Sequence, residues 1–303
     1  MNYIYELYVI LGGGVNLVLK KYIVILLLLF IFFIIIFLFY KSNEISRAFR
    51  SEAIKGLDRV NLFDKSVITE DHIKNLPGPV QKYLKYVGVV GREKVQNFRA
   101  EILIDINMGA KGQSSMMVHQ YDFFDSNPGR LALMQFKANG FPIIGFDAYI
   151  NGEGSMLMKP LGLVTVNSAR GKEEDNKSAE AITLCDMCMI APATLIDNRI
   201  TWTTIDSLKV KAVFNDNGQV VSGILAFNQV GQLISFSTVD KYYQKDDKSY
   251  EKVRWSASAG EYKEINGLRL PTYSEAVWHF NSGDFCYGKT HINKLEYNCT
   301  SFK

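Results

Sequence analysis

The chain has 303 residues, of which 48% are apolar and 13% aromatic, and its formal net charge is +3. A chain of this length and composition can bury a substantial core, which excludes an intrinsically disordered protein. Four cysteines in 303 residues exclude a disulfide scaffold. The mixed charges give no basic footprint for a nucleic acid.

The run Tyr22–Tyr40 contains nineteen consecutive uncharged residues. As a helix it would be about 28 Å long, close to the roughly 30 Å thickness of a bilayer core. We therefore expect residues 1–21 to form an N-terminal tail and residues 22–40 to form one transmembrane helix. Lys20 and Lys21 precede the run and no small-residue cleavage site follows it, which favours an uncleaved signal anchor. A removed signal peptide and a buried soluble helix are the alternatives.

Charges on both sides of this run bear on its orientation. Lys20 and Lys21 lie before it, and Lys41, Arg47, Arg50 and Lys55 lie after it. Counting these charges favours a cytoplasmic C-terminal domain, whereas the short basic N-terminus resembles that of an N-in anchor. We expect a single-pass membrane protein whose C-terminal domain is extracytoplasmic. Gly12–Gly14 are compatible with a translated ribosome-binding site, which would make Val15 the true start.

Residues 41–70 are charged and compatible with a helix, and we expect them to form a stalk before a single domain at 71–303. Apolar residues recur every three or four positions over Ile73–Val87, which predicts a helix. Pro77-Gly78-Pro79 favours a helix start, and Gly88 favours a helix end.

From Asn97 the apolar period changes to two, which is typical of half-buried strands. Further strands are expected at Ser115–Phe124, Arg130–Ala138, Ile143–Asn151, Ser155–Lys159, Leu163–Ser168, Ile200–Ile205, Lys209–Asn215, Val220–Phe227, Leu233–Lys241, Glu251–Ser258, Leu268–Phe280 and Phe285–Asn298. Short turns rich in Asn and Gly join several of them and predict hairpins. We therefore expect an α+β fold that is mainly β: a large, curved, mostly antiparallel sheet or half-barrel with a few packed helices.

A second helix is expected to interrupt the strands around Cys185 and Cys188, where apolar residues recur at amphipathic spacing. A redox CxxC pair would lie at a helix start, and Cys286 and Cys299 lack the paired spacing of a zinc site. The cysteines are therefore interpreted as small buried hydrophobic residues. The four histidines form no HxH or HxxxH pair, and we expect no metal and no cofactor.

The expected order of a helix, six strands, a helix and more strands resembles the lipoprotein-carrier group, in which helices partly plug a curved sheet. Three blocks resemble an uncharacterised bacterial family of membrane-anchored proteins, a domain of unknown function. These blocks are LPGPVQKYL at Leu76–Leu84, WTTID at Trp202–Asp206 and LPTYSEAVW at Leu270–Trp278. The likeness extends from about Leu76 to Asn298. It implies domain boundaries and membrane association without implying chemistry.

Glu275 is the carboxylate with the clearest catalytic potential, because it lies in a predicted strand opposite Trp278. If its face points inward, burial would raise its pKa and make it a candidate acid or ligand contact. The alternative is an ion pair with Arg254 or Lys241. Asp206 has the alternative role of capping the turn into Leu208.

We expect the concave face of the sheet to hold a lipid or another apolar ligand, because methionine side chains adapt to irregular apolar molecules. The candidate ligand-binding residues are Met134, Phe136, Met156, Met158, Trp202, Arg254, Glu275 and Trp278. Two alternatives remain open: a structural or interaction protein of the envelope, and a hydrolase-type enzyme that uses Glu275.

Overall fold

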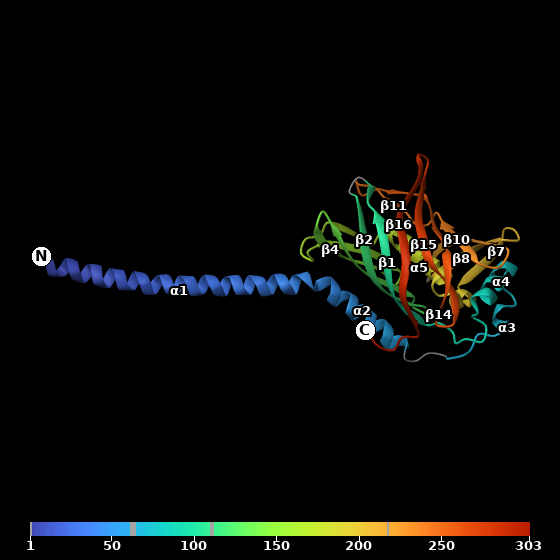
Figure 1. Ribbon diagram of the computed structural model, residues 1–303, viewed down its shortest axis with the longest axis horizontal. Helices are drawn as coiled ribbons and strands as arrows, with labels where there is room; N and C mark the ends of the chain where they lie inside the picture. The colour runs from blue at the N-terminus through green and yellow to red at the C-terminus, as the bar shows by residue number, and fades with distance from the viewer. Residues whose placement is uncertain (1, 61–64, 110–111, 217) are drawn as a thin grey trace. The chain divides into compact units, whose positions relative to one another are not determined.

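The computed structural model describes residues 2–60, 65–109, 112–216 and 218–303, with side chains described from residue 19 onward. The chain divides into two compact units, Met1–Glu44 and Ile45–Lys303. The first unit is one helix, α1 (Asn2–Ser42), which continues back through the predicted tail (Figure 1). Its part Leu19–Ser42 has a mean hydropathy of 3.5 and no buried residues, so it is long and apolar enough to cross a membrane. A signal sequence has the same properties.

The second unit is built on one 14-stranded sheet in which every described pair is antiparallel. Its first half comprises β1 (Asn97–Asn107), β2 (Gln113–Phe123), β3 (Gly129–Ala138), β4 (Phe141–Ile150), β5 (Glu153–Pro160) and β6 (Asn167–Arg170). Its second half comprises β7 (Ile200–Thr204), β8 (Lys209–Asp216), β9 (Gln219–Phe227), β10 (Leu233–Thr238), β13 (Arg254–Ser258), β14 (Gly260–Ile265), β15 (Leu268–Phe280) and β16 (Gly283–Tyr297). A separate ribbon pairs β11 (Tyr243–Gln244) with β12 (Tyr250–Glu251). The predicted α+β class and antiparallel sheet are confirmed.

The two halves join where β1 pairs with β16, so the first and last strands of the domain lie side by side in the middle of the sheet (Figure 1). From this centre the strand order runs through consecutive hairpins from β1 to β6 at one edge, and through β16, β15, β13, β10, β9 and β8 to β7 at the other, with β14 attached to β15. The two edge strands do not pair with each other among the described residues, so the sheet curves without closing into a barrel.

Among the described residues, four α-helices accompany the sheet: α2 (Glu44–Val60), α3 (Glu70–Ile73), α4 (Gly78–Val87) and α5 (Glu173–Met189). A 3₁₀ helix, Pro192–Ile196, follows α5. As predicted, Pro79 lies in the first turn of α4 and Gly88 ends this helix in a left-handed conformation, with φ 88°.

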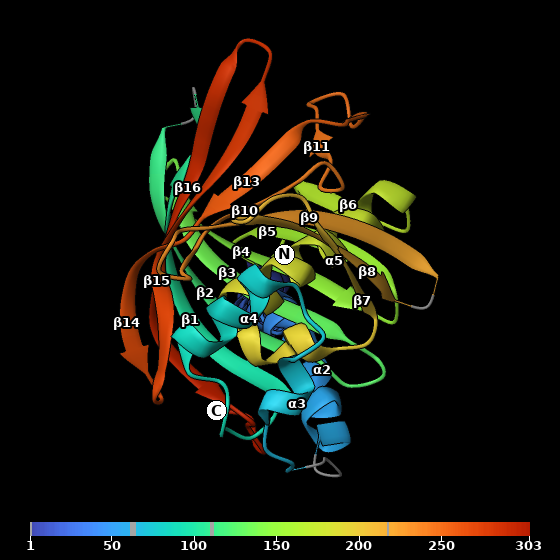
Figure 2. The same ribbon diagram turned by 90° about the vertical axis from the view of Figure 1, so that its right-hand side faces the viewer.

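Helix α5 lies in the concavity, where it contacts β3 to β6 on one arm of the sheet and β9 and β10 on the other (Figure 2). The helix predicted around Cys185 is present, but the prediction that it is amphipathic is wrong. From Ala179 to Met189 only Ile182 and Asp186 are not fully buried, because strands flank the helix on both sides. Cys185 and Cys188 are buried free thiols, and burial raises the pKa of both.

Helix α2 covers the other face of the sheet. Ile45, Phe49, Ala53 and Leu57 recur every fourth residue, are buried, and pack with Tyr121 and Leu133 among other residues of β2 and β3. These strand residues alternate with the concave ones, so α2 lies on the convex side. The expected stalk at 41–70 thus contains a helix that contacts the sheet. The division of the chain into tail, span, stalk and domain stays a prediction.

Candidate ligand-binding site

A cavity of about 560 Å³ lies in the concavity between α5, strands β1 to β5 and strands β13, β15 and β16. Protein interiors are close-packed and contain few voids larger than a water molecule. The volume falls within the roughly 300–1,000 Å³ of small-molecule sites. Six of the nine methionines line it: Met108, Met116, Met134, Met156, Met158 and Met189.

Strand alternation brings the apolar side chains into this space. Met134 and Phe136 lie two residues apart on β3, and Met156 and Met158 lie two apart on β5, so each pair shares one face of the sheet. Between these strands, Gly145 of β4 is paired with both Met134 and Met158. A Cβ atom at Gly145 would lie 2.9 Å from Met134 Cε, so this glycine makes room for the methionine side chain.

One end of the cavity is polar and centres on Arg130. The Arg130 guanidinium donates to Asp147 Oδ2 at 2.6 Å through Nη1 and to Asp186 Oδ2 at 2.9 Å through Nε. Gln120 Nε2 also donates to Asp186, at 2.9 Å, and to the buried Asp122 at the same distance. A guanidinium held by two carboxylates is fixed in orientation, and its positive charge is more than compensated.

Burial shifts the ionisation of this cluster. It disfavours the Arg130 cation, but Asp147 and Asp186 outweigh it and raise the pKa of Arg130 above its ordinary value. Burial raises the pKa of Asp122, and the neighbouring Asp186 adds to the shift. Burial also raises the pKa of Asp186, against the stabilising charge of Arg130. The carboxyls of Asp122 and Asp186 therefore titrate at higher pH than exposed ones.

Lys241 also lines this end of the cavity. Its ammonium lies over two indole rings, 5.7 Å from the ring centroid of Trp255 and 5.5 Å from that of Trp278. Trp255 Nε1 in turn donates to the hydroxyl of Tyr287, at 3.1 Å. Burial lowers the pKa of Lys241, although Asp147 is near enough to favour the charged form. Within the described part of the chain, no carboxylate lies within ion-pair distance of this ammonium.

The structure brings together half of the predicted ligand-binding residues. Met134, Phe136, Met156 and Met158 line the cavity, while Trp278 is buried beneath Lys241. Trp202 lies on β7 outside the cavity lining, half-buried, and its indole nitrogen has no partner among the described residues. Arg254 is exposed and contacts His279, with 3.3 Å between Nη2 and Nε2.

Glu275 does not line the cavity, whereas its neighbours Ser274 and Ala276 do. The strand therefore turns the Glu275 side chain to the opposite face. Its Oε1 accepts a hydrogen bond from the Tyr273 hydroxyl at 2.5 Å and lies 3.7 Å from Lys289 Nζ. The expected ion pair with Arg254 or Lys241 is thus wrong, because the neighbouring strand β16 supplies Lys289 instead.

Arg130, Asp147 and Asp186 were not among the predicted site residues, and Lys241 was considered only as a partner of Glu275. One usable signal was present, because Arg130 shares strand parity with Met134 and Phe136 and therefore puts a charge on the apolar face. Lys241 follows β10 in an irregular segment, where periodicity gives no direction for a side chain.

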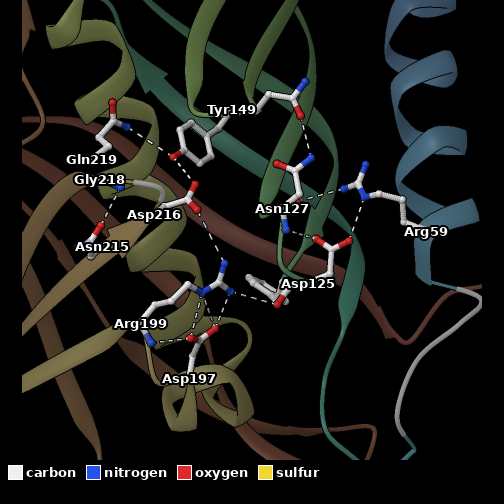
Figure 3. A network of polar contacts seen from close by, with 12 residues as sticks. Arg59, Asp125, Asn127, Tyr149, Asp197, Arg199, Asn215, Asp216, Gly218 and Gln219 are labelled. Carbon is white, nitrogen blue, oxygen red and sulfur yellow. Dashed lines mark hydrogen bonds and ion pairs between the residues drawn. The ribbon is translucent and has the colours of Figure 1, made fainter.

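A second polar network lies outside the cavity lining and joins the two arms of the sheet (Figure 3). The Tyr149 hydroxyl of β4 donates to Asp216 Oδ2 of β8 at 2.7 Å, and Arg199 Nη1 lies 3.9 Å from Asp216 Oδ1. On the side of α2, Arg59 Nε donates to Asp125 Oδ2 at 2.9 Å. We interpret this network as structural, because its charged and hydroxyl groups contact one another across the two halves of the sheet.

Across the described ranges, no group of three or more His, Cys, Asp or Glu side chains could hold a metal ion.

Comparison with known proteins places the chain in a family. Residues 66–290 match the model of a family of unknown function, DUF6544, and so include the three sequence blocks. The chain belongs to this family. No functionally curated protein matches it.

Three solved structures of low sequence identity are similar. An outer membrane lipoprotein-sorting protein domain from Vibrio parahaemolyticus is 9% identical, with 67% of this chain and 85% of that chain covered and a TM-score of 0.37. A LolA superfamily protein from Nitrosomonas europaea is 10% identical, with coverage of 76% and 94% and a TM-score of 0.35. A DUF1329 family protein from Desulfovibrio piger is 10% identical, with coverage of 77% and 94% and a TM-score of 0.40.

Proposed function

We propose that the domain binds a lipid or another apolar small molecule in the cavity of its curved sheet. The observation that carries this proposal is the cavity of about 560 Å³ and its lining of methionine, isoleucine and phenylalanine side chains. An apolar surface left around a void loses packing contacts that a ligand would restore. Methionine suits such a site, because its unbranched side chain repacks around different apolar shapes.

We further propose that α1 anchors the protein in a membrane through residues 22–40, with the domain on the extracytoplasmic side. The uncharged helix with no buried residues supports the anchor, and the short basic N-terminus supports the orientation. A membrane would then be both the location of the protein and the source of its ligand.

The test is native mass spectrometry of the full-length chain purified from its own host, paired with the variant Met158→Trp. We expect a lipid-sized adduct on the wild type. The larger indole should fill part of the cavity and lower the bound fraction, while the melting temperature changes by little. In a solid core the same change would overpack and cost about 1 to 3 kcal/mol.

The matched control is Val164→Trp, which adds the same side chain at a nearby residue that is 65% exposed. It should leave both the adduct and the melting temperature as in the wild type. A wild type that never carries or takes up an apolar molecule, together with a strongly destabilised Met158→Trp, would overturn the proposal.

A further inference from the structure

The charged side chains at the polar end of the cavity are unevenly paired: Arg130 holds both carboxylates, and Lys241 has no direct ion-pair partner among the described residues. Arg130 is paired with two carboxylates, Asp147 and Asp186, so no positive charge of the guanidinium is left for a ligand. Lys241 differs, because its ammonium contacts only the rings of Trp255 and Trp278. In the described part of the chain, Lys241 is thus the one cation of the cavity lining without an ion-pair partner.

We propose that the ligand of this cavity is an anionic amphiphile whose charged head pairs with Lys241 and whose apolar chain lies along the methionines. This inference rests on the proposed function and adds the chemical class of the ligand. Its head group is a carboxylate or a phosphate, both of which accept charge-assisted hydrogen bonds from an ammonium.

The surroundings of Lys241 favour this assignment over a purely structural role. A lysine is expensive to bury unless its charge is compensated. Ring faces compensate an ammonium only partly, since a cation over a ring gains about 0.5 to 2 kcal/mol. Burial lowers the pKa of Lys241, and Asp147 opposes this shift only in part. An anion within hydrogen-bond distance of the ammonium would give it the direct partner that the described side chains do not supply, and would offset the desolvation.

The groups that face Lys241 also limit what can bind there. Asp147, Asp186 and Cys185 lie on the β4 and α5 sides, and Trp255 and Tyr287 lie on the β13 and β16 sides. Both carboxylates already accept a hydrogen bond from Arg130. A cationic head group would have to compete with Arg130 for them beside the Lys241 ammonium, whereas a neutral one would leave Lys241 without an ion-pair partner.

The apolar part of the same cavity has room for the chain of such a molecule. Along β3 the lining changes from Arg130 to Met134 and then to Phe136, which lies close to the hairpin turn at 139–140. Met156 and Met158 line the cavity from β5 in the same manner. The site is therefore polar at one end and apolar over the rest, as an amphiphile requires.

The test uses three probes with twelve carbon atoms each: dodecanoate, dodecyl phosphate and dodecanol. Each is titrated by native mass spectrometry into the full-length chain in a non-ionic detergent, so that the detergent competes equally with all three. The wild type should bind at least one anionic probe about tenfold or more tightly than dodecanol, the range expected for a charge-assisted contact. A preference for one of the two anionic probes distinguishes a fatty-acid ligand from a phospholipid-like one.

Variants then assign the preference to one side chain. Lys241→Gln should remove the advantage of the anionic probes and leave dodecanol binding within about twofold of the wild type, whereas Lys241→Arg should retain the advantage because it keeps the charge. Lys211→Gln, an exposed lysine on β8, serves as the matched control and should behave as the wild type.

The outcomes separate the two proposals. If the wild type binds dodecanol as tightly as both anionic probes, the assignment of an anionic ligand is wrong while apolar binding stands. An anion preference that survives in Lys241→Gln would also overturn the role of Lys241. If none of the three probes binds the wild type, the proposed function itself fails. The probe comparison on the wild type needs no variant and therefore stays decisive if Lys241→Gln does not fold.

Discussion

Glu180 shows at the scale of one residue how burial sets ionisation in this domain. It is fully buried in α5, and neither carboxylate oxygen has a hydrogen-bond partner among the described residues. Burial raises its pKa to about 8, and Asp216 and Asp240 add to the shift, while the nearby Gln219 opposes it. Glu180 is therefore protonated in the folded protein at neutral pH and ionised in the unfolded chain.

The sign of the resulting pH dependence follows from proton binding. Between the unfolded pKa, about 4.3, and the folded value of about 8, the folded state holds one proton more than the unfolded state, so stability falls as pH rises. Glu180 should contribute a loss on the order of 1 kcal/mol per pH unit across this window. Glu180→Gln should remove this contribution to the pH dependence of the free energy of unfolding. Denaturant unfolding of the wild type and of Glu180→Gln at pH 5 and pH 8 measures the effect. An equal change in the free energy of unfolding between the two pH values in both proteins would contradict the prediction.

Single residues were predictable from sequence where the cause was local. Asp206 does cap the turn into Leu208, whose backbone N–H donates to its Oδ1 at 2.8 Å. Gly88 ends α4 as expected, because a left-handed end of a helix favours glycine. The direction of Glu275 was not predictable, since alternation groups residues into two faces without saying which face points inward.

At the scale of elements, close approach between helix and sheet explains two glycines. At Gly56 in α2, a Cβ atom would lie 2.3 to 2.6 Å from three ring atoms of Phe123 in β2. At Gly154 in β5, it would lie 2.2 Å from the backbone oxygen of Asp175 in the first turn of α5. Each glycine allows a helix to contact the sheet on one of its two faces.

This contact gives a test of whether α2 is part of the domain. Gly56→Ala should force the Phe123 ring to move, lower stability by about 1 to 3 kcal/mol and make α2 more accessible to protease. The control is Gly78→Ala in α4, where nothing lies within 4 Å of the added atom, and stability should be unchanged or slightly higher. Thermal unfolding and limited proteolysis measure both effects. If Gly56→Ala behaves as Gly78→Ala, α2 is a stalk that needs no contact with the sheet.

The sequence predicted the bounds of helices and strands better than it predicted which of their faces are buried. Alternation placed β15 at its observed bounds, Leu268–Phe280. It missed β14, Gly260–Ile265, because this short strand pairs with β15 alone and none of its residues is fully buried. The burial of α5 on nearly every side depends on two arms of the sheet that are distant in sequence, and no local pattern encodes it.

At the scale of the whole molecule, the decisive contacts are those farthest apart in the chain. The pairing of β1 with β16 joins residues nearly 200 positions apart, and Tyr149 with Asp216 joins the two arms. Hairpins fixed the order of neighbouring strands, but these long-range contacts determine the curvature and therefore the cavity. Methionine content indicated an apolar site, whereas the polar end forms only when Arg130 of β3, Asp147 of β4, Asp186 of α5 and Lys241 of an irregular segment come together in the fold.

The proposed membrane anchor also belongs to this scale, because an apolar ligand would be supplied most directly to a domain tethered at a bilayer. Leu29 and Ile34 lie near the centre of the uncharged run and are 48% and 40% exposed on α1. Replacing both with arginine should cost roughly 5 to 7 kcal/mol of insertion free energy, which is comparable to the whole favourable sum of the run.

The double variant should leave the membrane fraction or be degraded, while the control Leu29→Phe with Ile34→Val keeps the helix apolar and should remain integrated. Alkaline extraction of membranes from cells that express each protein measures the difference. Because the substitutions lie outside the domain, the purified variant should also retain the dodecyl-probe affinities of the wild type. An arginine variant that resists extraction as firmly as the control would show that residues 22–40 do not anchor the protein.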